Sequence, residues 1–164
     1  MNKSDVNPLF RYNAWASDRV LAQAARLTRE QYIAPAPTPQ GSLRGTLVHA
    51  LAAEMLWPQR VEGESPARLL SVEDVPTFKA LQDDWTRARE ALDAFLGTLT
   101  DEQLQTVVRY RTTKGVSQFN VVWEMLAHLI NHGTQHRAEA AMLLTIHGFS
   151  PGDLDLIVFL REGN

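Results

Sequence analysis

Four stretches of the sequence repeat apolar residues at the spacing of an α-helix, and this pattern constrains the fold more than any other feature. The spacing predicts long helices over residues 8–27, 42–58, 76–99 and 120–147. Three prolines and a glycine within residues 35–41 exclude a helix between the first two stretches, and Gly148 follows the last one in the position of a C-terminal cap. Four long helices with polar outer faces predict an all-α fold, a four-helix bundle.

Local signals predict where some of these helices begin and end. Asn7 and Pro8 have the residue types of an N-cap and a first helical position. Ser42 is expected to open the second helix. Pro58 is expected to end or kink that helix, because proline lacks an amide donor and clashes with the preceding turn.

The remaining segments predict shorter elements. Residues 100–103 have the form of a capping box, which indicates one further helical turn. Residues 106–118 are rich in strand formers around a Lys-Gly turn, so we expect a small β-hairpin before the last long helix. Residues 150–160 predict a final short helix, with Asp153 and Asp155 in its N-terminal cap.

Composition excludes several classes of protein. The 164 residues carry a net charge of −3 and no cysteine, so we expect a single domain over residues 1–164 without disulfides, a thiolate metal site or a cysteine nucleophile. The mild acidity argues against nucleic acid as a partner. No apolar run approaches the roughly 18 residues of a membrane span, and the N-terminus has no signal-peptide pattern. We therefore expect a cytoplasmic protein that binds neither nucleic acid nor membranes.

Three of the five histidines lie at intervals of four on the longest predicted helix: His128, His132 and His136. Each step of four residues advances about 40° around a helix, so the three form one stripe, which apolar neighbours predict to face inward. Two imidazoles four residues apart can hold one transition-metal ion, and a third ligand must come from another helix. His49 is the only other histidine in the middle of a predicted helix.

The alternative is that these histidines are hydrogen-bonded core residues. A single inward histidine is more often a hydrogen-bonded core residue than a metal ligand. Three histidines at intervals of four with a fourth opposite are harder to explain in this way, because several buried imidazoles are costly without partners, and the spacing alone favours a metal site and a hydrogen-bonded core about equally. The HExxH pattern of many zinc proteases is absent, since Leu129 and Gly133 stand where its glutamate would be.

Several segments resemble the DinB/YfiT-like family. The sequence HLINHGTQHRAE at residues 128–139, followed by GFSPGDLD at 148–155, is similar to the C-terminal signature of that family. YNAWA at residues 12–16 resembles its first-helix motif, and VHALAAE at 48–54, followed by Trp57, resembles its second-helix motif. The resemblance covers most of the chain.

The resemblance implies a fold and a metal site. It implies a four-helix bundle with up-down-down-up connectivity and a divalent ion, commonly zinc or nickel, held by three histidines. Carried over by motif, the ligands are His49, His132 and His136, and His128 is expected to be a neighbour of the site and not a ligand. The chain departs from the family at one point: where the family often has Gly-Gln after the His-Arg pair, this chain has Ala-Glu.

Three further residues are candidates for the pocket around the metal. Trp57, at the end of the second helix, is expected near the mouth of the site. Arg137 is expected to pair with a carboxylate such as Glu54 or Glu139, and binding of an anionic substrate is the alternative. Glu54 lies about 140° around the helix from His49, so it need not face the metal.

These observations leave open whether the chain is an enzyme. The first hypothesis is a metal-dependent enzyme with an open metal position that binds either a low-molecular-weight thiol, as a thiol S-transferase does, or water, as a hydrolase does. The resemblance favours the thiol, because characterised relatives include enzymes that use bacillithiol or mycothiol. The second hypothesis is a non-enzymatic metal-binding stress-response protein. We expect a small-molecule substrate in the first case, and the flat faces of a bundle predict a homodimer.

Overall fold

The structure is a computed structural model that describes residues 1–162, and it is mostly helical with one small β-hairpin. The expected fold class is confirmed. The elements in chain order are α1 (Lys3–Ala24), α2 (Arg29–Ile33), α3 (Leu43–Val61), α4 (Phe78–Thr98), α5 (Asp101–Leu104), β1 (Val107–Arg111), β2 (Ser117–Val121), α6 (Val122–Ile146) and α7 (Leu156–Arg161). No described helix has the length and hydropathy needed to cross a membrane.

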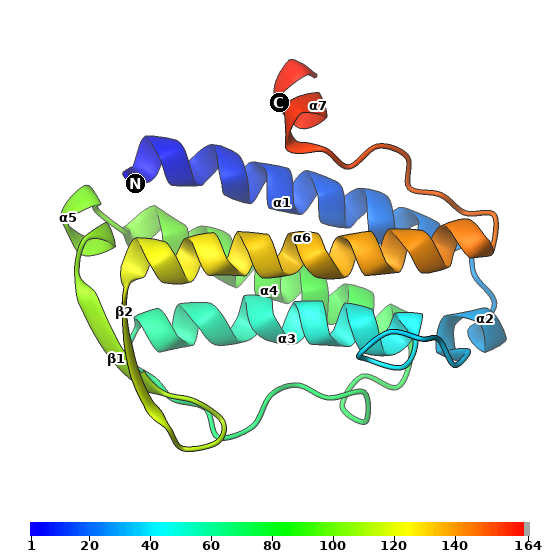
Figure 1. Cartoon of the computed structure of the whole chain (residues 1–164), viewed down its shortest axis with the longest axis horizontal. Coiled ribbons are helices and arrows are strands. Elements are labelled where there is room, and N and C mark those ends of the chain that lie inside the picture. Colours follow the sequence, from blue (N-terminus) through cyan, green and yellow to red (C-terminus); the bar gives the residue numbers. More distant parts are fainter. Residues whose placement is uncertain (163–164) are drawn as a thin grey trace.

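The four long helices α1, α3, α4 and α6 lie side by side with up-down-down-up connectivity (Figure 1). α1 and α4 are antiparallel, because Lys3 at the start of α1 donates to the Gly97 carbonyl near the end of α4. α3 and α6 are also antiparallel, since His49 lies beside His136 and Trp57 beside His128. The parallel pair α3 and α4 requires the long connection over residues 62–77, which returns along the outside of the bundle (Figure 1).

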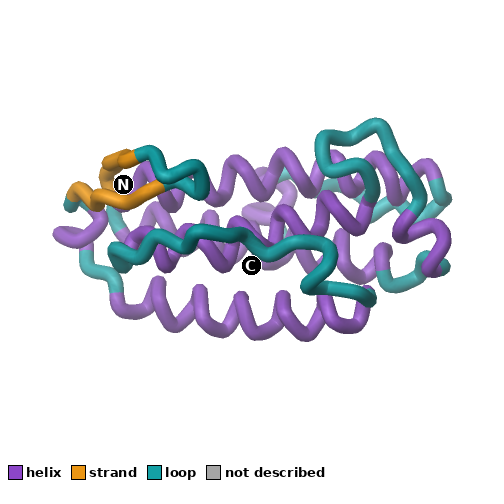
Figure 2. Tube along the Cα trace, turned by 90° about the horizontal axis from the view of Figure 1, so that it is seen from below, coloured by secondary structure: helices purple, strands orange, loops and turns teal. Residues whose placement is uncertain are grey.

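The hairpin closes one end of the bundle. β1 and β2 are antiparallel, with Val107 opposite Val121 and Arg111 opposite Ser117. Figure 2, like Figure 1, shows the hairpin and the N-terminus at the same end of the bundle. Tyr110 is the buried residue of β1, and it packs against Trp57 of α3 with ring centroids 5.8 Å apart.

Two apolar clusters fill the interior, one towards each end of the bundle. The cluster at the α2 end includes Val20, Leu47, Leu51, Leu81, Trp85 and Leu144. The cluster at the hairpin end includes Phe10, Phe95, Leu104, Leu126 and Leu129. Trp85 is therefore a core residue, as its helical spacing predicts, and Trp123 packs half-buried against the second cluster.

A buried layer of polar side chains lies between the two apolar clusters. Asn13 of α1 donates from Nδ2 to Oε1 of Glu54 on α3 at 2.7 Å. Arg137 of α6 donates to Oδ1 of Asn13 and, at 2.9 Å, to Oγ1 of Thr134. Each of Asn13, Glu54 and Arg137 is 5% exposed or less. The layer therefore ties α1, α3 and α6 together at one level of the bundle.

Asn13 takes the place of the direct ion pair expected for Arg137. Among the described residues Arg137 forms no ion pair with Glu54 or Glu139; Asn13 stands between the guanidinium and the Glu54 carboxylate. The Arg137 guanidinium also lies over the Tyr12 ring, 5.4 Å from its centroid. Burial raises the pKa of Glu54, and the Asn13 hydrogen bond and the Arg137 charge oppose this only in part.

Three predicted helix boundaries are wrong. α1 begins at Lys3 and not near Pro8, because Asn2 and Asp5 form a capping box before that proline. α3 does not end at Pro58 but continues to Val61, because the Pro58 carbonyl still accepts from the Glu62 amide and closes the turn that follows the proline. α7 begins at Leu156, after an extended segment.

The capping of the last helix also differs from the prediction. Asp155 occupies the N-cap position of α7 but makes no side-chain cap hydrogen bond, and the Asp153 carboxylate instead accepts from the Asp155 amide at 3.0 Å. The short helix α2, with its Thr28–Gln31 capping box, was not predicted. The Ser42 cap, the Thr100 capping box and the Gly148 stop, with φ of +81°, are confirmed.

The polar layer requires a glycine at position 133. A Cβ at Gly133 would lie 2.7 Å from Nη1 of Arg137 and 2.9 Å from Oδ1 of Asn13. We predict that Gly133→Ala lowers the free energy of unfolding of the metal-free protein by about 1–3 kcal/mol, the usual cost of overpacking a buried site. Denaturant titration measures the change.

Gly97 provides the matched control. It is a helical glycine near the end of α4, is exposed, and has nothing within 4 Å of a built Cβ. Gly97→Ala should therefore raise the free energy of unfolding by about 0.5–1 kcal/mol, the helix propensity of alanine over glycine. Equal changes in the free energy of unfolding for Gly133→Ala and Gly97→Ala would contradict the close packing of the polar layer around Gly133.

Candidate metal centre

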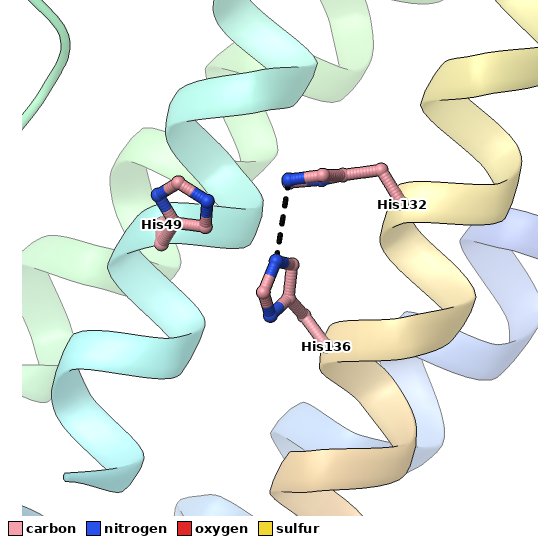
Figure 3. Close-up of side chains that lie close together, drawn as sticks. All are labelled: His49, His132 and His136. Atoms are coloured by element: carbon pink, nitrogen blue, oxygen red, sulfur yellow. Dashed lines mark hydrogen bonds between the residues drawn. The ribbon is translucent and has the colours of Figure 1, made fainter. Parts of the chain in front are cut away.

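Three histidines from two antiparallel helices come together in the middle of the bundle. His49 projects from α3 towards His132 and His136, which project from successive turns of α6 (Figure 3). One ring nitrogen from each lies within 4.8 Å of the other two. The Nε2 atoms of His132 and His136 are 3.2 Å apart. The spacing of four along α6 places this pair on one face, and His49 completes the cluster from the facing helix.

The histidine stripe on α6 passes from the interior to the surface. His136 is 4% exposed, His132 is half-buried and His128 is exposed. The prediction that the whole stripe faces inward is therefore wrong for His128, because the stripe winds around the helix by about 40° at each step. His128 is near His132, with ring centroids 5.6 Å apart, but it does not belong to the cluster of three.

A carboxylate fixes the protonation of one ring of the cluster. Nδ1 of His136 donates to Oε2 of Glu139 at 2.8 Å, one turn further along α6. A neutral His136 ring held this way carries its proton on Nδ1 and directs the lone pair of Nε2 towards His132 and His49. Such carboxylate–histidine pairs orient metal ligands in many proteins. Glu139 stands at the point where the chain departs from the family pattern, and sequence analysis considered it only as a partner for Arg137.

The environment favours neutral rings at His49 and His132. Burial lowers the pKa of His49, and the charge of His136 lowers it further against the opposing effect of Glu139. Burial and the three neighbouring histidines lower the pKa of His132 to about 4. A neutral imidazole is the form that binds a metal, so protons compete weakly for these two rings at neutral pH.

The donor set fits a divalent transition-metal ion. Two nitrogens bound at about 2.0–2.1 Å to one tetrahedral ion lie roughly 3.3 Å apart, and the His132 and His136 Nε2 atoms are 3.2 Å apart. The buried Nδ1 of His132 has no hydrogen-bond partner within residues 1–162, and its Nε2 is the atom that faces the other two histidines. Three imidazoles suit zinc, nickel, copper or iron and leave a position open on the ion.

The other predicted pocket residues fall into two groups. His128 is exposed, and the half-buried Trp57 lies next to it, with ring centroids 4.6 Å apart. Glu54 and Arg137 lie behind it in the polar layer, so Glu54 does not face the cluster, as its angle on the helix predicts. A cleft of about 510 Å³ between α3 and α4 includes Glu54 in its lining but none of the cluster histidines.

Sequence analysis missed Arg60, Tyr110 and Asn13. Arg60 is 7% exposed and packs against the rings of Trp57 and Tyr110. Its spacing from His49 could have identified it, because Arg60 follows His49 by eleven residues and so lies on nearly the same face of α3, three turns away. Asn13 lies in the YNAWA segment that resembles the first-helix motif of the family, but its role depends on contacts between three helices, which this motif does not show.

Comparison with known proteins agrees with the sequence resemblance. The sequence profile of the DinB family matches residues 1–162. Over 163 aligned residues the chain is 24% identical to Protein DinB of Bacillus subtilis (strain 168), and the alignment covers 94% of each protein.

The lowered pKa of His132 predicts a pH dependence of stability in the metal-free protein. The unfolded chain takes up a proton at this ring near pH 6.5, whereas the folded chain resists protonation until about pH 4. The unfolded state binds more protons in this interval, so the free energy of unfolding should fall as the pH is lowered from 6.5 to 4. Denaturant titrations at several pH values, with a chelator present, measure it.

The same titrations on His132→Gln and Gln135→Ala isolate the contribution of His132. His132→Gln should flatten the slope between pH 6.5 and 4. Gln135→Ala changes an exposed neighbour on α6 and should leave the slope as in the wild type. An unchanged slope in His132→Gln would show that the ring is not held neutral in the folded state.

Proposed function

The chain belongs to the DinB family, and we propose that it is a metal-dependent enzyme of the thiol S-transferase type, acting on a small-molecule substrate with a low-molecular-weight thiol. The observation that carries the proposal is the His49, His132 and His136 cluster, with ligand atoms within 4.8 Å of one another. We propose these three side chains as the ligands of one divalent ion, zinc or nickel.

A divalent ion bound there would supply an open position at which the deprotonated form of a thiol is favoured. The residues of the chain hold and orient this site. Glu139 fixes the His136 ring, and the polar layer beside it holds the backbone of α6 against α1 and α3. The solvent-facing side, next to His128 and Trp57, is the side from which we propose that the thiol enters.

The carboxylates near the cluster support a thiol over water as the nucleophile. Hydrolysis normally uses a general base close to the attacking water. Of the two nearby carboxylates, Glu139 is engaged by His136 and Glu54 is buried with Asn13. A thiol ionises near pH 8.5 when free, so it needs less help from a base than water does. The same three histidines would also serve a hydrolase, and the experiments below distinguish this alternative from a thiol S-transferase.

The ligand assignment predicts the metal content of variants. The purified protein should bind about one zinc or nickel ion per chain, because three histidines fill three positions of a single site. His49→Ala, His132→Ala and His136→Ala should each lose most of this metal after dialysis, as measured by elemental analysis. His128→Ala, the matched control on the same helix, should retain it with at most a partial loss of affinity, on the order of 10–100-fold. Loss of metal in His128→Ala alone would overturn the assignment.

The proposed chemistry predicts a spectroscopic signal. Cobalt in place of the native ion should give a sulfur-to-cobalt charge-transfer band when a small thiol is added, and the band should be absent in His49→Ala. A hydrolase would instead show metal-dependent cleavage governed by an ionisation near pH 7, without the band. A non-enzymatic metal-binding protein would show neither signal, and either of these results would reject the thiol proposal.

A further inference from the structure

Among residues 1–162, Arg60 is a buried cation without an anionic partner. It lies in the last turn of α3 and is 7% exposed. Its Nε is buried with no hydrogen-bond partner, and within residues 1–162 its side chain forms neither a hydrogen bond nor an ion pair. Buried charges in proteins are normally paired, so this one requires an explanation.

Two aromatic rings hold the Arg60 guanidinium in place. Its Cζ lies 4.7 Å from the centroid of Trp57 and 5.0 Å from that of Tyr110. The Tyr110 hydroxyl in turn donates to Asn120 of β2 at 3.1 Å, which fixes the ring from the hairpin side. Stacking on ring faces stabilises the positive charge but uses none of the five N–H donors along the edge of the guanidinium. The side chain is thus fixed in orientation with its hydrogen-bonding capacity unused.

Arg60 lies on the same side of α3 as the metal cluster. Eleven residues separate it from His49, which corresponds to a rotation of about 20° and a rise of roughly 16 Å. Long side chains on a helix point back towards its N-terminus, and the Arg60 guanidinium lies over Trp57, one turn nearer to His49, so we expect a gap of roughly 10 Å between it and the cluster.

Aromatic and imidazole rings line the way from Arg60 to the cluster. The Trp57 ring contacts His128 at 4.6 Å between centroids, and His128 is 5.6 Å from His132. His128 is exposed, so this stretch is accessible from solvent.

We propose that Arg60 binds a carboxylate of the thiol substrate, with the thiol group of the same molecule at the His49, His132 and His136 cluster. A guanidinium edge matches a carboxylate with two parallel hydrogen bonds, and the contacts with the two rings, which are inclined at 74° to each other, use none of the donors that these bonds need. The inference rests on the proposed thiol function and specifies its substrate class: a flexible thiol that carries a carboxylate about 10 Å from its sulfur.

Pairs of synthetic thiols test the proposal. The probes are ω-mercapto carboxylic acids with three, six and eight carbons and the matching ω-mercapto alcohols, titrated calorimetrically into the zinc-loaded protein. At the best-fitting length the acid should bind roughly 10–100-fold more tightly than the alcohol, the range expected for a hydrogen bond to a charged group. Absence of any preference for the acid at all three lengths would overturn the proposal.

Substitutions assign the preference to Arg60. In Arg60→Gln the acid should lose its advantage and bind like the alcohol, and Arg60→Lys should keep part of it. Arg109→Gln removes the same charge from the exposed face of the hairpin and should leave the preference intact. If Arg60 only anchored the hairpin, Arg60→Gln would weaken acid and alcohol equally, and this result would also reject the proposal.

A further titration tests carboxylate binding at Arg60 independently of the proposed thiol function. Hexanoate, which has no thiol, is titrated into the metal-free protein and into its Arg60→Gln variant. Binding to the wild type that Arg60→Gln abolishes supports the carboxylate site even if no thiol binds to the zinc-loaded protein. Equal affinity of hexanoate for both proteins, or no binding to either, would contradict it.

Discussion

The buried hydrogen bonds of Arg137 are the interaction on which the rest of the structure depends. Arg137 follows His136 directly on α6, and through Asn13 it is connected to Glu54 on α3. These groups lie between two apolar clusters, where an unpaired charge or amide would be costly, so the three helices have one favourable alignment. That alignment sets the level of His136 against His49. The close approach also explains the glycine at position 133, which leaves room for the guanidinium.

The candidate metal site uses the two sides of α6 differently. One side carries the charged polar layer, in which Arg137, Asn13 and Glu54 are linked by hydrogen bonds. The other carries imidazoles that have few partners within residues 1–162: there a carboxylate orients His136 alone, and the buried Nδ1 of His132 has no hydrogen-bond partner. Burial keeps the pKa of His49 and His132 low, so the cluster offers lone pairs and little positive charge. This is a suitable environment for a cation, and the exposed His128 marks the side from which solvent and ligands reach it.

Much of the fold and the three-histidine cluster could be predicted from the sequence, because both depend on helical periodicity. The spacing of His132 and His136, the position of His49 on a second helix and the hairpin before α6 are local patterns that the structure confirms. The errors have physical causes. α1 begins early because the capping box of Asn2 and Asp5 lies before Pro8, and α3 passes Pro58 because the Glu62 amide still closes the following turn on the Pro58 carbonyl. Asn13 and Arg60 act through contacts between distant segments, which periodicity does not encode.

The central claim is that His49, His132 and His136 together hold one metal ion, and the most direct test is to locate that ion. Crystals of the zinc-loaded protein, measured above and below the zinc absorption edge, give its position by anomalous scattering. The account predicts one peak per chain about 2.0–2.1 Å from the Nε2 atoms of His132 and His136 and from a ring nitrogen of His49. A peak held by His128 without His49, or by surface carboxylates alone, would contradict the account.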